Sequence, residues 1–449
     1  MVWFAQFLRN RKESKMSTVT KPIMLDETGE EIRDTLKGLK EATESIATIL
    51  SGDRVKIYGM HIDGNESSPS AKITYLDDAV GMTPVGMDYA NDKFDYGSWS
   101  DVWFIKECKP CILKQDGSVQ CYLDKNDYSK DVDGNTVTID ENLTGANVMV
   151  EFPKIWLKVI PDENDPYSAS VYVSNQRVDS GYKDYAYIDS RKRHQEHFYM
   201  AAYNSSTVSS VLRSISGQTS AKTKFLDASE EISYAEANGA GWSTEHAGQI
   251  MLINFLLMLI SKSTNTQAVF GEGITSGAES AFNGYATGSL NNKGLFYGDD
   301  GTSTAVKVFG IENWWGLQWR RYRGDILSSG NLLIKLCYGQ EDGSTVDNFN
   351  LDGTGYRQIT NGSPSGTSGQ YISQMLFDDS DIFVKTANNN GASATTQYCD
   401  GYWFAASGVR FTLRGGDSRS GSRCGAFYVA RSLDAGYRDW NIGAVLSYI

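Results

Sequence analysis

Short apolar runs separated by Gly, Asp and Asn constrain the fold of this chain more than any other feature. Runs such as "AKITYLDD", "DVWFIKEC", "NTVTID" and "NVMVEFPKIWLKVI" have the length of strands, and turn-forming residues bound them. In "KQDGSVQ" an Asp-Gly pair predicts a hairpin turn between two strands. Together with 44 Gly and 25 Tyr, this pattern favours a fold rich in strands and loops.

One segment departs from this pattern and predicts a buried helix. In "STEHAGQIMLINFLLMLISKS" the apolar run from Ile250 to Ile260 is too short to cross a bilayer, so we expect no membrane insertion. We expect Ser243 or Thr244 to cap this helix, with Glu245 in its first turn.

A second helical pattern lies in residues 30–51, where apolar residues alternate at spacings of four and three. This is the heptad pattern of a coiled coil, and its isoleucines and leucines are compatible with three helices as well as two. We favour a short oligomerising stalk. The alternative is one amphipathic helix packed on a globular domain. The seam positions are Ile32, Leu36, Leu39, Thr43, Ile46 and Leu50.

The rest of the chain divides by composition. Residues 1–29 place apolar residues before basic ones, the reverse of a secretory signal, so we expect no Sec export. Residues 56–160 predict a small antiparallel domain or an extended β-rich connector. Residues 161–449 mix strands, helices and long loops rich in Gly and Asn. Six cysteines without a pairing pattern indicate synthesis in a reduced cytoplasm.

Several kinds of chemistry are disfavoured by the sequence. A net charge of -13 argues against a nucleic-acid partner. No phosphate-binding loop, dinucleotide fingerprint or nucleophile elbow occurs. His194 and His197 lack zinc-protease spacing, and Cys108 with Cys111 supplies half of a zinc knuckle, so we expect no metal and no other cofactor. Glycoside hydrolysis by two carboxylates leaves no local signature and stays open.

The segment "FGIENWWGLQWRRYRGDI" combines three Trp with Arg320, Arg321 and Arg323. These residues suit a surface on which a ligand stacks. We favour the simpler interpretation, in which the Trp side chains fill the core and the Arg side chains pair with acidic neighbours.

The C-terminal stretch "RGGDSRSGSRCGAFYVARSLDAGYRDWNIG" uses a restricted set of amino acids. Between Asp417 and Asp439 there is no Lys, Glu, Gln, Met or Trp, and Arg is the only basic residue.

The order "GAGWSTEHAGQIMLINFLLML", "FGIENWWGLQW", "ASGVRFTLRGG", "GAFYVA" and "NIGAVLSYI" resembles the variable proteins of diversity-generating retroelements, such as phage major tropism determinants and related fibre proteins. The resemblance covers roughly the last 290 residues. It implies an α+β chain in which residues 161–449 form a C-type-lectin-like domain of the formylglycine-generating-enzyme type. In this family an error-prone reverse transcriptase rewrites adenine-containing codons, and Lys, Glu, Gln, Met and Trp are out of reach.

The resemblance implies a variable region at about 415–440 with diversified and constant positions. Alternation along a strand there would place Phe427, Val429 and Arg431 on one side and Tyr428, Ala430 and Ser432 on the other. The implied constant frame is Gly415, Gly416, Gly425, Phe427, Val429, Leu433, Trp440, Ile442 and Gly443, and Cys424 fits either class. The implied receptor-binding positions are Asp417, Ser418, Arg419, Ser420, Ser422, Arg423, Tyr428, Ala430, Arg431, Ser432, Asp434, Ala435, Tyr437, Arg438 and Asp439.

The resemblance implies a phage tail or head fibre protein located in the virion. Its partners would be a host-cell surface receptor, protein or glycan, and other virion proteins, with residues 1–29 as the attachment segment. A homotrimer would present several binding faces. The alternatives are an enzyme on the same fold, either formylglycine-generating or glycan-cleaving, and a variable protein displayed on a bacterial surface.

Overall fold

The computed structural model describes residues 55–219, 225–378, 382–387 and 391–449. Lys56–Ile449 form one compact unit. Within it strand residues outnumber helical residues, as the short apolar runs predict, and the class is α+β. The predicted attachment segment 1–29, the stalk 30–51 and all six seam positions lie outside the described residues.

Two antiparallel sheets contain most strands of the first half of the unit. A four-stranded sheet has the order β2-β1-β10-β9. Its strands are β1 (Ile57–Ile62), β2 (Ile73–Asp77), β9 (Trp156–Pro161) and β10 (Ala169–Ser174). A seven-stranded sheet has the order β14-β27-β11-β8-β5-β6-β7. Its strands are β5 (Lys109–Lys114), β6 (Val119–Asp124), β7 (Asp127–Asp131), β8 (Ala146–Pro153), β11 (His197–Ala201), β14 (Trp242–Thr244) and β27 (Leu446–Tyr448).

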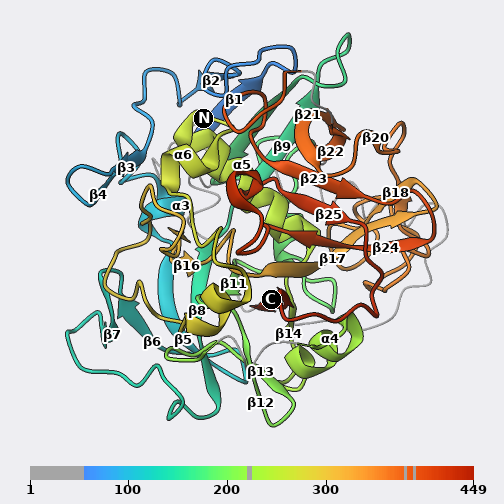
Figure 1. Cartoon of the computed structure of the whole chain (residues 1–449). Coiled ribbons are helices and arrows are strands. Elements are labelled where there is room, and N and C mark those ends of the chain that lie inside the picture. Colours follow the sequence, from blue (N-terminus) through green and yellow to red (C-terminus); the bar gives the residue numbers. More distant parts are fainter. Residues whose placement is uncertain (1–54, 220–224, 379–381, 388–390) are drawn as a thin grey trace, which may run out of the picture. The chain divides into compact units, whose positions relative to one another are not determined.

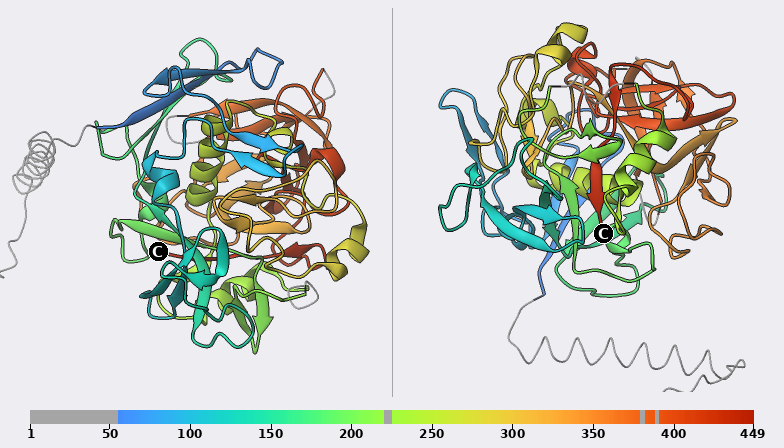
Figure 2. Two further views of the ribbon diagram at one scale, coloured as in Figure 1. Left: turned by 90° about the vertical axis from the view of Figure 1, so that its left-hand side faces the viewer. Right: turned by 90° about the horizontal axis from the view of Figure 1, so that it is seen from below.

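The seven-stranded sheet corrects the predicted domain boundary at residue 160. Strand β8 pairs with β5 on one side and with β11 on the other, so it joins the two predicted domains. Strand β27 from the end of the chain lies between β14 and β11, and Figure 2 shows this last strand in red beside green strands. One hydrophobic cluster also extends from Met60 to Ile442. Residues 56–160 are therefore part of the same unit, because strands on both sides of residue 160 need each other as partners.

The C-terminal half builds a ten-stranded sheet with the main order β19-β18-β17-β24-β25-β23-β21-β22-β20, and β26 pairs with β17. Figure 1 shows its orange and red strands on one side of the unit. The strands are β17 (Trp319–Ser328), β18 (Asn331–Ile334), β19 (Arg357–Gln358), β20 (Ser365–Gly366), β21 (Gln370–Phe377), β22 (Ile382–Ala387), β23 (Gly401–Phe404), β24 (Val409–Arg414), β25 (Val429–Arg431) and β26 (Ile442–Gly443).

Three short hairpin-like pairs and a few helices complete the unit. The pairs are β3 (Gly86–Asp88) with β4 (Lys93–Asp95), β12 (Ser206–Val208) with β13 (Val211–Arg213), and β15 (Lys307–Val308) with β16 (Ile311–Glu312). The helices are α3 (Trp103–Lys106), α4 (Ala228–Glu236), α5 (Ala247–Ser261), α6 (Thr266–Phe270) and α7 (Ala278–Gly284), with 3-10 turns at η1 (Tyr185–Tyr187) and η3 (Gly421–Arg423).

Helix α5 is the buried helix that the apolar run predicts, and all of its residues are buried. Figure 1 and the left view of Figure 2 show it inside the unit with strands on either side. Its N-cap is His246, so the prediction of Ser243 or Thr244 was wrong. Those two residues belong to β14, where they pair with β27, and Glu245 is used by an ion pair with Arg414 instead.

Two local predictions are confirmed by the packing. Asp116 and Gly117 lie in the turn between the antiparallel strands β5 and β6. In the Trp-Arg segment, Trp314 and Trp315 are fully buried, and the buried Arg321 forms an ion pair with Glu231. The core position of the segment is therefore confirmed, but pairing with an acidic side chain is seen for Arg321, whereas Arg320 bonds to Asn204 and Arg323 to the Thr244 carbonyl.

Candidate functional site

The predicted variable region is built on the centre of the ten-stranded sheet. Strand β25 pairs antiparallel with β24 and parallel with β23. The chain between β24 and β25 forms a first loop, 415–428, and the chain between β25 and β26 forms a second loop, 432–441. The region is therefore two loops joined by a three-residue strand (Figure 1).

Arg431 lies on the inner face of β25 and does not belong to an exposed surface. Its side chain is 2% exposed and forms a two-pronged ion pair with Asp325, at 2.7 Å from Nε to Oδ1 and 2.6 Å from Nη2 to Oδ2. A further guanidinium nitrogen donates to the Tyr402 hydroxyl at 3.1 Å. These partners raise the pKa of Arg431 against the opposing effect of burial. The prediction of Arg431 as a receptor-binding residue was wrong, because the side chain is buried in an ion pair with Asp325, a residue far away in the sequence.

Tyr428 and Ala430 lie on the opposite face of β25, as the alternation predicts, but this face is also covered. Both residues are buried. The Tyr428 hydroxyl accepts a hydrogen bond from Nε1 of Trp403 at 2.8 Å, and its ring packs 4.6 Å from that of Trp319. Ala430 lies beside Trp403 in the parallel pair of β25 and β23. Neither residue is available to a receptor in this structure.

Asp417 and Ser418 at the start of the first loop are buried as well. The Asp417 carboxylate accepts hydrogen bonds from Nδ2 of Asn441 at 2.6 Å and from the Arg419 guanidinium at 2.9 Å. The Ser418 hydroxyl donates to the Ala278 carbonyl at 2.7 Å. These two positions hold the first loop against the second loop and α7, which corrects their prediction as contact residues.

The remaining predicted positions reach the surface of the two loops. Arg419 is packed 5.0 Å from the ring of Trp440. Arg438 forms ion pairs with Asp227 and Glu230 at the start of α4, which anchors the second loop. The half-buried positions are Ser420, Arg423, Ser432, Ala435 and Asp439. The exposed positions are Arg419, Ser422, Asp434, Tyr437 and Arg438.

Glycines hold the first loop close to its supports. Gly425 has φ +153°, and a Cβ atom there would lie 2.0 Å from Oδ1 of Asp400. Gly416 has φ +81°, and its Cβ would lie 2.5 Å from Sγ of Cys424. Cys424 is buried and its thiol contacts the Asp417 carbonyl. Of the two classes that the sequence allowed for Cys424, constant frame or diversified position, this environment fits the constant frame.

Two aromatic residues outside the variable region adjoin it, and the sequence analysis missed them. Trp403 in β23 is 42% exposed, and the half-buried Tyr371 in β21 bonds to Ser422 through its hydroxyl at 2.8 Å. No sequence pattern connects them to the first loop, because the link is the pairing of β23 with both β21 and β25.

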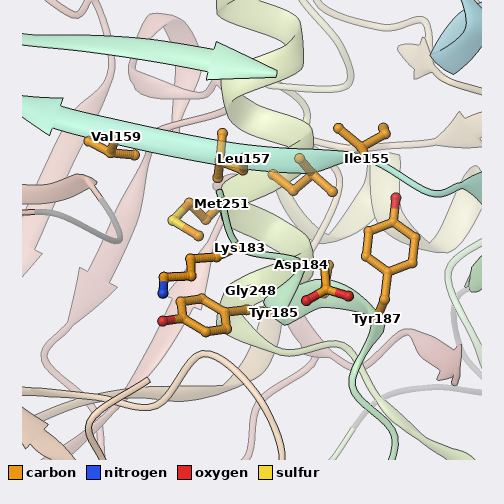
Figure 3. A pocket seen from close by; sticks show the side chains of 11 residues that line it. Ile155, Leu157, Val159, Lys183, Asp184, Tyr185, Tyr187, Gly248 and Met251 are labelled. Carbon is orange, nitrogen blue, oxygen red and sulfur yellow. The ribbon is translucent and has the colours of Figure 1, made fainter. Parts of the chain in front are cut away.

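Two hollows of the described unit lie away from the predicted variable region. The cavity in Figure 3 lies between β9, η1 and α5 and has a volume of about 10 Å³, room for about one water molecule. A larger hollow of about 420 Å³ is lined by Trp242, Tyr338 and Glu236 among others, and no predicted site residue lines it.

His194 and His197 have separate environments. His194 bonds through Nδ1 to Asp184 at 2.9 Å and through Nε2 to Glu341 at 3.0 Å. His197 begins β11, with its Nε2 3.8 Å from Glu151.

Cys108 and Cys111 are both buried, Cys108 just before β5 and Cys111 within it. Across the described ranges, no group of three or more His, Cys, Asp or Glu side chains is arranged to hold a metal ion.

We expect His194 to make the folded protein less stable as the pH becomes alkaline. Hydrogen bonds to Asp184 and then Glu341 raise the pKa of His194 from 6.5 to about 9. A raised folded-state pKa stabilises the protein fully below the unfolded pKa, and this contribution is lost as pH rises through about 9. Because the side chain is 42% exposed, solvent screening limits the effect to roughly 1 kcal/mol or less.

Urea unfolding of the native chain and of His194→Gln at about pH 6 and about pH 10 measures this contribution. The variant is expected to lose less stability than the native chain over this interval. An identical pH dependence in the two proteins would contradict the assignment.

No protein-family model matches this sequence, and no curated protein matches it significantly. Among the helices that the structure describes, none has the length and apolar character needed to span a membrane.

Proposed function

We propose that Lys56–Ile449 is a binding module that displays a changeable surface on a fixed frame. More particularly, it is the receptor-binding part of a phage tail or head fibre protein whose variable region is diversified by a retroelement. In this proposal residues 161–449 are the C-type-lectin-like portion, and the β-rich strands before residue 160 are built into it.

The observation that carries the proposal is the separation of exposed and buried positions within 415–441. Five of the predicted diversified side chains are exposed, and they lie on two loops. The frame beneath them is held by buried bonds of Arg431, Asp417 and Tyr428. A rigid frame with exposed Tyr, Arg, Ser and Asp side chains has the character of an antibody paratope.

The restricted amino-acid set agrees with this arrangement. Arg without Lys across 417–439 follows from codon rewriting and needs no selection for a basic surface. The function of the exposed positions is then to change, while the buried positions keep the loops in place.

The oligomer and the particle belong to the same proposal. A stalk at residues 30–51 would join three copies, residues 1–29 would attach them to other virion proteins, and the loops would face the host-cell surface. Three weak sites on one trimer, with several trimers on a virion, would raise avidity by orders of magnitude over one site.

Adsorption of virions to host cells tests the proposed surface. We expect the triple variant Arg419→Ser, Asp434→Ser and Tyr437→Ser to lower the adsorption rate constant by about tenfold or more, because these exposed side chains supply direct contacts. Asp434→Ser and Tyr437→Ser should change thermal stability little, whereas Arg419 also pairs with the buried Asp417 carboxylate, so thermal melting must show that the triple variant is folded.

The matched control changes exposed residues outside the two loops, with Arg191→Ser and Val178→Ser. The control virions should adsorb at the native rate. Native adsorption by the triple variant would overturn the proposed surface.

A further inference from the structure

Trp403 has a geometry that distinguishes it from the other tryptophans near the variable region. Trp314 and Trp315 are fully buried, whereas Trp403 is 42% exposed. A Cβ atom on Gly369 would lie 2.7–3.0 Å from the six-membered ring of Trp403, so the indole occupies the space above a residue without a side chain. One part of the ring therefore packs on the backbone of Gly369, just before β21, while another part is exposed to solvent.

The indole is also held in one orientation. Its Nε1 donates to the Tyr428 hydroxyl at 2.8 Å, and the Tyr428 ring is buried against Trp319. A large aromatic side chain with a fixed position loses little conformational entropy when a ligand packs on it. Trp403 is thus prepared to act as a flat support for a ligand.

Tyr371 brings the tip of the first loop next to this support. Tyr371 is paired with Gly401, two residues before Trp403 on the same face of the sheet. Its hydroxyl bonds to Ser422 at 2.8 Å, and the guanidinium of Arg423 lies 5.6 Å from its ring centroid. The Trp403 platform, defined as Trp403, Tyr371, Ser422 and Arg423, therefore combines two aromatic rings, two hydroxyl-bearing side chains and a cation.

The cation of this platform is not neutralised within the described part of the chain. No described carboxylate lies within ion-pair distance of Arg423, and its buried Nε has no hydrogen-bond partner. The other arginines of the loops differ, since Arg419 pairs with Asp417 and Arg438 pairs with Asp227 and Glu230. An uncompensated guanidinium favours a planar anionic group such as a carboxylate.

We infer that the Trp403 platform binds an acidic sugar. This inference rests on the proposed receptor-binding function and specifies the chemical class of the receptor group that is bound. The C–H face of the sugar ring packs on the exposed indole, and the sugar carboxylate pairs with the Arg423 guanidinium. The platform also carries the hydroxyl groups of Tyr371 and Ser422, which suits a hydroxylated ring better than a purely apolar peptide side chain.

This arrangement divides recognition between constant and diversified residues. Trp403 and Tyr371 lie outside the variable region, so every member of a diversified set would keep the sugar support. Ser422 and Arg423 lie within it, so a change at position 423 would alter the preference for acidic over neutral sugars without removing the support.

Binding of a galacturonic acid tetramer to the full chain tests the inference, with the methyl ester of the same tetramer as the uncharged control probe. Titration calorimetry and tryptophan fluorescence measure the dissociation constants. We expect the native chain to prefer the acid over the ester. Trp403→Ala should weaken binding of both probes by about tenfold or more, and Trp403→Tyr should retain part of it. Arg423→Ser should abolish the preference for the acid while keeping weak binding of both probes.

The matched controls are Ile160→Ala, which removes an apolar side chain that is also 42% exposed, and Arg191→Ser, which removes an exposed cation elsewhere. Both should bind the acid as the native chain does, and thermal melting shows whether each variant is folded. Absence of acid binding by the native chain, or native binding by folded Trp403→Ala, would overturn the inference.

The direct binding assay separates this inference from the proposed function. If the loop variants reduce adsorption but the native chain does not bind the acid, receptor binding stands and the acidic sugar is wrong. If the acid binds at Trp403 but adsorption is unaffected by every loop and platform variant, the sugar site stands and the receptor-binding role is wrong.

Discussion

Arg431→Ala is expected to lower the free energy of unfolding by about 3–5 kcal/mol, one of the two largest effects that we predict for this chain. The guanidinium is 2% exposed and the Asp325 carboxylate 4% exposed, and two hydrogen bonds join them. Removal of Arg431 leaves the carboxylate in the interior without its countercharge. The Thr412 hydroxyl, which donates to Oδ1 of Asp325 at 2.8 Å, cannot replace a full charge.

Equilibrium unfolding in urea measures the loss. The double variant Arg431→Met with Asp325→Leu is the informative control, because removing both charges avoids the unpaired carboxylate and should recover much of the stability. Tyr437→Ser, at an exposed position, should change stability by roughly 0.5 kcal/mol or less. Arg431→Ala within about 1 kcal/mol of the native chain would show that the buried ion pair does not have the assigned role.

This result would also distinguish structural positions from exposed positions within the predicted variable region. A library randomised at all predicted diversified positions should return folded proteins with Arg431 enriched, while positions 434 and 437 tolerate many residues. The reason is that position 431 has a fixed partner and the other two are exposed.

Glu245→Ala is the second change with a large expected effect, again about 3–5 kcal/mol. Glu245 and Arg414 are 0% and 1% exposed and form a bidentate pair at 2.7 and 2.8 Å. The Arg414 guanidinium also lies 3.8 Å from the ring of Trp314. Without Glu245 this guanidinium keeps its aromatic contact but loses its only ion-pair partner among the described residues.

The expected consequence extends to the first loop, because Arg414 is the last residue of β24 and the loop begins at Gly415. Urea unfolding gives the stability loss, and hydrogen exchange of residues 415–428 reports the local effect. Glu245→Gln retains hydrogen-bonding oxygen and nitrogen atoms and should be milder than Glu245→Ala. Equal stability of Glu245→Ala and the native chain, or unchanged exchange in the loop, would contradict this account.

Predictions that depend on near neighbours agree with the structure. The Asp-Gly turn at 116–117, the buried helix α5 and the core position of the Trp-Arg segment all follow from local patterns. The alternation that separates Tyr428 and Ala430 from Val429 and Arg431 also agrees with the strand pairing. These features depend on backbone periodicity or on apolar content, which a short stretch of sequence contains.

Predictions that depend on distant partners were less successful. The exposure of Arg431 depends on Asp325, which lies 106 positions earlier in the chain. Glu245 was predicted in the first turn of α5, but it lies before the helix and forms an ion pair with Arg414, 169 positions later. The boundary at residue 160 was wrong for the same reason, since β8 pairs with strands on both sides of it.

The sequence by itself determined the abundance of short strands, the one long buried helix and the unusual amino-acid set of residues 417–439, because composition and periodicity are properties of the chain alone. Only the tertiary structure decided which members of that set face outward. In the folded protein Asp417, Tyr428 and Arg431 are buried against partners from other strands and loops, and Arg423 lies near the ring of Tyr371, on the same face of the sheet as Trp403. The physical reason is that a polar side chain becomes part of the frame when folding brings it a buried partner, and such partners come from anywhere in the sequence.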